Sequence, residues 1–250
     1  MKKKATYFST LVGVIMFFGL WQLMALIVHR PILPSPVIVV PLFLAGMTGE
    51  LGLHFLASAG RVLAAVVLAT LFAAPLGLAL GQMPKLDRIF GPLIAIIYPI
   101  PKIIFLPVIY VLMGISDFSK ITLIAIIIFF QILVVVRDEA SSLKKELILS
   151  VKSLGAGRRA LFKYVYLPAS IPAVLTALRI SVGTAVAVLF IAEQSLTSYG
   201  LGYYIVVETY QVLLYPEMYT GIMGMGLLGV LLYFAIYSIE LKVSKHMFVD

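Results

Sequence analysis

Few residues in this sequence have the type and spacing that catalysis requires. Gly155 and Gly157 lie in a glycine-containing segment, but that segment follows a helix-like stretch rather than a strand and lacks the lysine of a phosphate loop. The chain has no cysteine, and no two of its three histidines have the spacing of metal ligands. A nucleophile elbow and a paired-histidine zinc motif are also missing. We therefore expect no enzyme active site, cofactor site or metal site in this chain.

Charged and polar residues within or near long apolar segments are the candidates for handling a solute. A charge at mid-bilayer costs about 2.5–3.5 kcal/mol on insertion scales, so such residues usually face the protein interior. Arg179 either faces that interior or extends to the cytoplasmic interface. Glu193, followed by Gln194, either lines an outer gate or is solvated at the interface. Lys102 either contacts an anionic solute or pairs with a carboxylate. These four residues are candidates for a translocation path.

Prolines interrupt the apolar segment that contains Lys102, at about 92–114. Pro99 and Pro101 each remove a backbone donor, as does Pro107 further along. A span broken this often must line a cavity or be covered by neighbouring helices. Pro99 and Pro101 therefore join the path candidates, and a kinked packing helix is the alternative.

The elements that position these residues are predicted to be membrane spans. Of 250 residues, 62% are hydrophobic and 12% are charged, whereas a soluble domain has roughly 25% charged residues. The mean hydropathy of +1.10 agrees. We predict an all-α, polytopic membrane protein in which residues 1–250 form one transmembrane domain with its core at 55–240. The apolar run at about 9–28 is long enough to be an uncleaved first span.

Six spans are predicted, and their flanking charges orient them. They lie near 9–28, 57–81, 92–114, 121–136, 172–194 and 218–239. With the N-terminus inside, fourteen of the 19 Lys and Arg residues fall on the inner side and two on the outer side. The net charge of +8 then reflects topology rather than nucleic-acid binding, and both termini are expected in the cytoplasm.

Other segments are predicted around these spans. Residues 37–47 are expected to form a short helix at the outer interface. Turns or loops are expected at 84–88, 117–120 and 195–216. In the second span, small residues recur at every fourth position and predict a close helix–helix contact. They are Ala65, Ala69, Ala73, Gly77 and Gly81.

The longest polar stretch, within 137–170, is predicted to form an elbow of two short helices. The apolar face of the first helix consists of Leu147, Val151 and Leu154. Gly155 can adopt the left-handed conformation that ends a helix. A second helix is expected at 158–163. Pro168 and Pro172 are expected to interrupt the chain before the next span. The elbow either lies on lipid headgroups or fits a groove in a partner protein.

The elbow resembles the "EAA" loop of ABC-type importer permeases. Ser153-Leu154-Gly155-Ala156 is followed, after a short basic stretch, by Leu167-Pro168. Segments 33–36, 99–107, 178–180 and 192–203 are similar to the nitrate, sulfonate and taurine branch of that family, so the likeness covers nearly the whole chain. The resemblance implies a type I importer permease with a cytoplasmic coupling loop at 141–168. The residues that it assigns to ATPase coupling are Glu146, Leu147, Val151, Leu154, Gly155, Ala156, Arg158 and Pro168.

One departure concerns the acidic residue of that loop. The family's Glu-Ala-Ala triplet falls on Leu149-Ser150-Val151 here, and Glu146, one helical turn earlier, is a candidate replacement. The departure puts one docking salt bridge in question and leaves the apolar face and Gly155 in place.

The resemblance also implies partners. Separate ATP-binding ABC subunits would hold the ATP, and a second permease copy would complete the path as a homodimer. An extracytoplasmic solute-binding protein would deliver the substrate to the outer loops. The permease itself would lie in the lipid of the cell (inner) membrane. The substrate would be a small anion such as a sulfonate, taurine or nitrate, although the branch also carries uncharged heterocycles. The alternative is an ion-gradient-driven secondary transporter, a class that often shows internal repeats and midplane charges. A membrane enzyme or a structural subunit is a third possibility, which the missing catalytic constellation disfavours.

Overall fold

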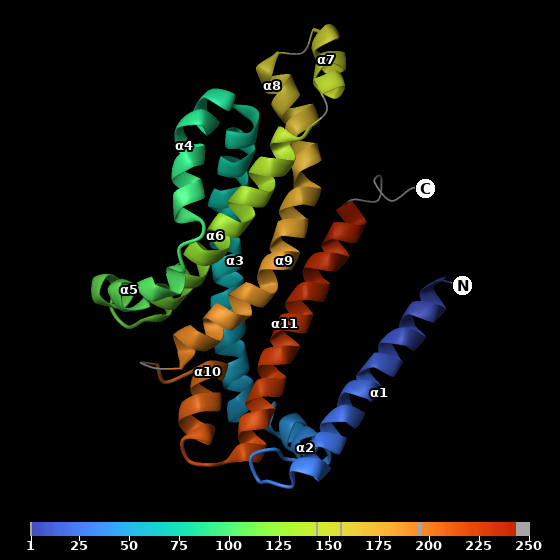
Figure 1. The fold of residues 1–250 in the computed structure, drawn as a ribbon, viewed down its shortest axis with the longest axis vertical. Coiled ribbons are helices and arrows are strands. Elements are labelled where there is room, and N and C mark those ends of the chain that lie inside the picture. The colour runs from blue at the N-terminus through green and yellow to red at the C-terminus, as the bar shows by residue number, and fades with distance from the viewer. Residues whose placement is uncertain (1, 144, 156, 195–196, 244–250) are drawn as a thin grey trace. The chain divides into compact units, whose positions relative to one another are not determined.

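Helices make up the regular structure of residues 2–143, 145–155, 157–194 and 197–243, which the computed structural model describes (Figure 1). This confirms the predicted all-α class. The chain divides into two compact units. Unit 1 comprises Met1–Ser58 and Glu193–Gly226, and unit 2 comprises Ala59–Ala192 and Leu227–Asp250.

Unit 1 contains two N-terminal helices and the segment that precedes the last helix. Its elements are α1 (Lys2–Val28), α2 (Pro36–Gly46), the start of α3 (Glu50–Gln82), α10 (Leu201–Tyr203), η3 (Tyr204–Tyr210) and the start of α11 (Tyr215–Val243). The predicted short helix at 37–47 is confirmed as α2. Ser35 caps it by accepting a hydrogen bond from the Val37 amide, and Pro36 occupies the first turn, where no amide donor is needed. The indole of Trp21 donates to the Pro34 carbonyl at 3.0 Å and ties α1 to this corner.

Unit 2 contains most of the long helices. Its elements are the rest of α3, α4 (Pro84–Ile97), η1 (Lys102–Phe105), α5 (Leu106–Met113), α6 (Asp117–Ser141), α7 (Lys145–Ser153), α8 (Arg158–Leu161), η2 (Phe162–Tyr166), α9 (Leu167–Glu193, with Glu193 itself in unit 1) and the rest of α11. The predicted contact of small residues is confirmed between α3 and α6. A Cβ atom added at Gly77 would lie 2.8 Å from the Leu133 carbonyl oxygen, and one at Gly81 would lie 2.4 Å from the Arg137 carbonyl oxygen.

The predicted count of six spans is not confirmed. Within the described residues, four helices are long and apolar enough to cross a membrane. The count becomes five if the bent pair Pro84–Ile97 and Lys102–Met113 is taken as one span. The predicted first span at 9–28 lies in the 27-residue helix α1, of which only the part Val12–Val28 enters this count, as a shorter apolar helix. The predicted span at 92–114 is divided, because α4 and the η1–α5 helix meet at an angle of 82° across the prolines.

Three predicted turns are helical instead. Pro84 begins α4, since proline is tolerated in the first turn of a helix. Residues 117–120 form the first turn of α6, where Ser116 and Ser119 make a reciprocal capping box. Part of the predicted loop at 195–216 is helical at 201–210, in α10 and η3.

The predicted interruption at Pro168 and Pro172 is also wrong. Helical structure continues from Arg159 to Glu193 through both prolines. A π-type turn at Phe162–Tyr166 ends two residues before Pro168. Such local adjustments allow a helix to accommodate a missing backbone donor.

Candidate functional site

The elbow is built from α7, Gly155 and α8. Figure 1 shows α7 and α8 at one end of unit 2, beyond the adjoining ends of α6 and α9. The φ angle of Gly155 is +82°, which confirms the predicted left-handed conformation. A Cβ atom added there would meet no atom within 4 Å, so the backbone angle, not a lack of space, favours glycine.

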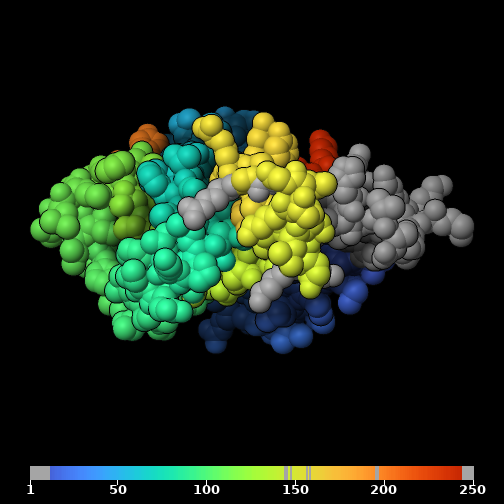
Figure 2. Space-filling view, turned by 90° about the horizontal axis from the view of Figure 1, so that it is seen from above, coloured from blue at the N-terminus to red at the C-terminus, as the bar shows by residue number. Residues whose placement is uncertain are grey.

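The elbow exposes apolar side chains. Leu154 is 84% exposed and Leu149 is 62% exposed, whereas Val151 is half-buried. Glu146 is exposed on the same helix. Figure 2 views this end of the molecule and shows the yellow atoms of the elbow uncovered beside the blue-green atoms of α4.

Not every residue predicted for the elbow is described. Ala156 lies outside the described residues, as do the side chains of Leu147 on α7 and Arg158 on α8. Pro168 is exposed in the first turn of α9. The assignment of these residues to ATPase coupling stays a prediction.

Lys102 stabilises the break between α4 and η1. Its ammonium group is within hydrogen-bond distance of three carbonyl oxygens, those of Tyr98 at 2.8 Å, Ile97 at 3.1 Å and Ile100 at 3.2 Å. It also lies 4.7 Å from the centre of the Phe130 ring on α6. Lys102 is 8% exposed, and it donates to carbonyls at the break, where helical hydrogen bonding is interrupted.

The prolines of the path prediction lie in this same break. Pro99 and Pro101 are exposed between α4 and η1. The structure therefore brings Pro99, Pro101 and Lys102 together at one bend. Their assignment to a translocation path stays a prediction.

Arg179 joins α9 to α11. Its Nε lies 2.9 Å from Oε2 of Glu240, and its guanidinium donates to the Tyr233 hydroxyl at 3.2 Å. Glu240 is 7% exposed and also accepts a hydrogen bond of 2.7 Å from Thr176. The guanidinium lies over the Tyr237 ring at 5.7 Å. These contacts hold the Arg179 side chain, which is 28% exposed, between α9 and α11. Its assignment to a translocation path stays a prediction.

Sequence reasoning missed Glu240 as the partner of Arg179. The available signal was a single acid near the end of the last apolar segment. Nothing in the sequence spacing relates that position to α9, because the pairing is made by helix packing.

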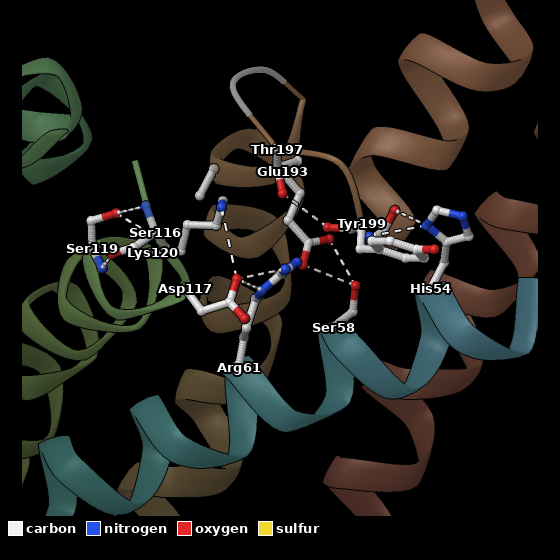
Figure 3. A network of polar contacts seen from close by, with 12 residues as sticks. His54, Ser58, Arg61, Ser116, Asp117, Ser119, Lys120, Glu193, Thr197 and Tyr199 are labelled. Carbon is white, nitrogen blue, oxygen red and sulfur yellow. Dashed lines mark hydrogen bonds and ion pairs between the residues drawn. The ribbon is translucent and has the colours of Figure 1, made fainter. Parts of the chain in front are cut away.

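Glu193 ends α9 and has no exposed surface. Its carboxylate accepts hydrogen bonds from the Ser58 hydroxyl, at 2.7 Å to Oε2, and from the Gly202 amide at 3.0 Å. Figure 3 shows Ser58 and Glu193 pointing toward each other, with His54 beside Tyr199. Complete burial excludes the solvated interpretation of Glu193. Gln194, which follows it, is half-buried.

Sequence reasoning also missed Ser58 and His54. Their signal was two polar residues four positions apart at the start of an otherwise apolar helix, which places them on one helix face.

Long apolar helices, a broken helix and an uncovered elbow together are typical of a helical membrane protein. The chain belongs to the family described as the binding-protein-dependent transport system inner membrane component, whose match covers residues 73–247. This confirms the predicted permease of an ABC importer, and an ion-gradient-driven secondary transporter is not favoured.

Individual relatives agree with this membership. The chain is 34% identical to the taurine transport system permease protein TauC of Escherichia coli (strain K12) over 157 residues, which are 63% of this chain and 57% of TauC. It is 30% identical to a putative ABC transporter permease protein of Methanocaldococcus jannaschii over 220 residues, 85% of this chain and 82% of that protein.

A solved structure shows the same fold. An inward-facing conformation of the MetNI methionine ABC transporter superposes with a TM-score of 0.65 at 20% sequence identity. The superposition covers 79% of this chain and 97% of the matched chain.

Proposed function

We propose that this chain is the permease subunit of an ATP-driven importer for a small anion, with a sulfonate such as taurine as the first candidate. Family membership and the relation to a taurine permease support this proposal. Two copies enclose the path in the cell inner membrane, with their termini in the cytoplasm. Separate ATP-binding subunits dock on the elbow, and an external solute-binding protein delivers the anion.

The uncovered elbow is the observation that carries the proposal. An apolar side chain that is 84% exposed at Leu154 adjoins the left-handed turn at Gly155. Burying a leucine-sized side chain is worth about 1.5–3 kcal/mol, so a groove that covers Leu154 gains that much. The exposed carboxylate of Glu146 is available on α7 for the salt bridge that the family's missing glutamate would make.

We place anion selectivity in the solute-binding protein rather than in the spans. Lys102 is engaged by three backbone carbonyls, and Arg179 is engaged by Glu240 and Tyr233. A cation that already has close partners gains less from a passing sulfonate than an exposed cation would. The path then has only to let the anion through.

The docking arm of the proposal is tested with Leu154→Asp. This substitution places a charge in the proposed contact, so the ATP-binding subunit should no longer copurify while the amount of permease in the membrane stays unchanged. Leu213→Asp is the matched control, because Leu213 is also exposed, at 65%, but lies in the turn before α11. Copurification that survives Leu154→Asp would argue against the elbow as the docking site.

The energy source is tested in proteoliposomes that contain the permease and the purified solute-binding protein, with labelled taurine as the probe. We expect accumulation with ATP and the ATP-binding subunit, and none with an ion gradient alone. Accumulation driven by a gradient with no ATP-binding subunit present would refute the proposed function.

A further inference from the structure

A helical segment in unit 1 has its first amide groups bound by side chains from other helices. This segment, residues 201–210, comprises α10 and η3, and the residue before it, Gly200, has no side chain to cap it. Three successive amides at its start are bound instead by buried side chains of α3 and α9. The bonds run from Gly200 N to His54 Nδ1 at 3.0 Å, from Leu201 N to Ser58 Oγ at 2.8 Å and from Gly202 N to Glu193 Oε2 at 3.0 Å.

The three acceptors form one connected set. Ser58 and Glu193 have no exposed surface and His54 is 2% exposed. The Ser58 hydroxyl accepts from Leu201 and donates to Glu193, so it bridges segment 201–210 to the end of α9. A carboxylate is favoured at the start of a helix, where the unpaired amides carry partial positive charge.

His54 also holds the far part of the segment. Its Nδ1 lies 3.0 Å from the Gly200 amide nitrogen and 3.1 Å from the Gly200 carbonyl oxygen, and its Nε2 lies 3.2 Å from Oε2 of Glu208. In the tautomer that accepts from the Gly200 amide, the ring proton is on Nε2 and faces Glu208. The rings of Tyr199 and Tyr204 lie against the imidazole, with centroids 5.2 Å and 5.3 Å from it. His54 therefore contacts the segment before its first turn and again near its end.

We propose that His54, Ser58 and Glu193 are positioning residues that latch segment 201–210, and that the segment is released as one unit during the transport cycle. The role in the cycle rests on the proposed function. If the segment moved away, the three side chains would lose the amides of Gly200, Leu201 and Gly202 together, and each lost hydrogen bond to a buried polar group is unfavourable. Partial release is therefore disfavoured, and the latch has two discrete states, held or free.

The latch is tested in the otherwise cysteine-free chain with a cysteine at Leu201, which has no exposed surface. The permease is placed in lipid nanodiscs, and its rate of labelling by an impermeant maleimide is measured. Ser58→Ala removes the bridging hydroxyl and should raise the labelling rate at least tenfold. Thr209→Val is the matched control, and it should change the labelling rate less than twofold. Within the described residues, the buried Thr209 hydroxyl donates hydrogen bonds to the Tyr204 and Ile205 carbonyls, which belong to its own segment.

A second reporter separates release from unfolding. A cysteine at Leu133, which is 3% exposed in α6, should stay unlabelled in every variant. Equal rates for Ser58→Ala and Thr209→Val would overturn the latch, and so would simultaneous labelling of the Leu133 reporter.

Conservative rescue tests the positioning role of Glu193. In Glu193→Gln, one amide oxygen can still accept from Ser58 and Gly202, so this variant should label more slowly than Glu193→Ala. With the ATP-binding subunit present, Glu193→Ala should raise substrate-independent ATP hydrolysis, and Glu193→Gln should raise it less. Identical behaviour of the two variants would contradict the proposal. Labelling needs no ATP-binding subunit, so failure of the latch and failure of the proposed function give different results.

Discussion

Gly155→Val places a β-branched residue at a φ angle of +82°, and its effect can be worked from the structure. Holding such a residue there costs about 1–3 kcal/mol. No atom lies within 4 Å of the added Cβ, so no packing forces the strained angle to persist. The elbow will relax instead, and its docking-competent population will fall by about 5- to 150-fold.

The assay is a titration of the purified ATP-binding subunit against the permease in nanodiscs. The Kd of Gly155→Val should rise by the same factor, because only the competent population binds, while membrane insertion stays unchanged. Uptake at a limiting concentration of ATP-binding subunit should fall in proportion.

Two control variants separate backbone strain from added bulk. Gly155→Asn should bind within about threefold of the original chain, since asparagine tolerates the left-handed region. Gly157→Val adds the same side chain two residues away, in equally open space and outside the left-handed region, and should have no effect. A Kd unchanged in Gly155→Val, or raised equally in Gly157→Val, would refute the reasoning.

Two further predictions concern packing and topology. Gly81→Ala should lower the thermal stability of the solubilised permease, because the new Cβ would lie 2.4 Å from the Arg137 carbonyl oxygen. Overpacking of this kind costs about 1–3 kcal/mol. The control is Gly60→Ala in the same helix, whose new Cβ meets no atom within 4 Å and should not lower the stability. An equal loss in both variants would show that helix α3 is not tightly packed at Gly81. An impermeant thiol reagent applied to intact cells should label a cysteine at the exposed Gln211 and not one at the exposed Lys152, and the reverse pattern would overturn the orientation with the elbow inside.

The elbow shows which features the local sequence can predict. Gly155 was predicted to take the left-handed conformation because it closes an amphipathic turn, and its φ angle confirms this. The glycine and alanine repeat of α3 was read in the same way, since residues four apart share a face whatever they pack against. The sequence did not predict that Pro84 and Ser116 begin helices, because both alternatives, turn and helix start, use the same residue types.

Composition and periodicity alone determined that this chain is an all-α membrane protein with a polar elbow, because the bilayer requires long apolar helices and leaves polar residues to the connections. Only the tertiary structure decided the partners of the membrane charges. Lys102 donates to carbonyls at a bend whose angle no local sequence pattern predicts, and Arg179 pairs with a carboxylate on another helix. Segment 201–210 is the clearest case. Its first two amide bonds join residues 146 and 143 positions apart, and no local pattern can report contacts that exist only once distant helices have packed.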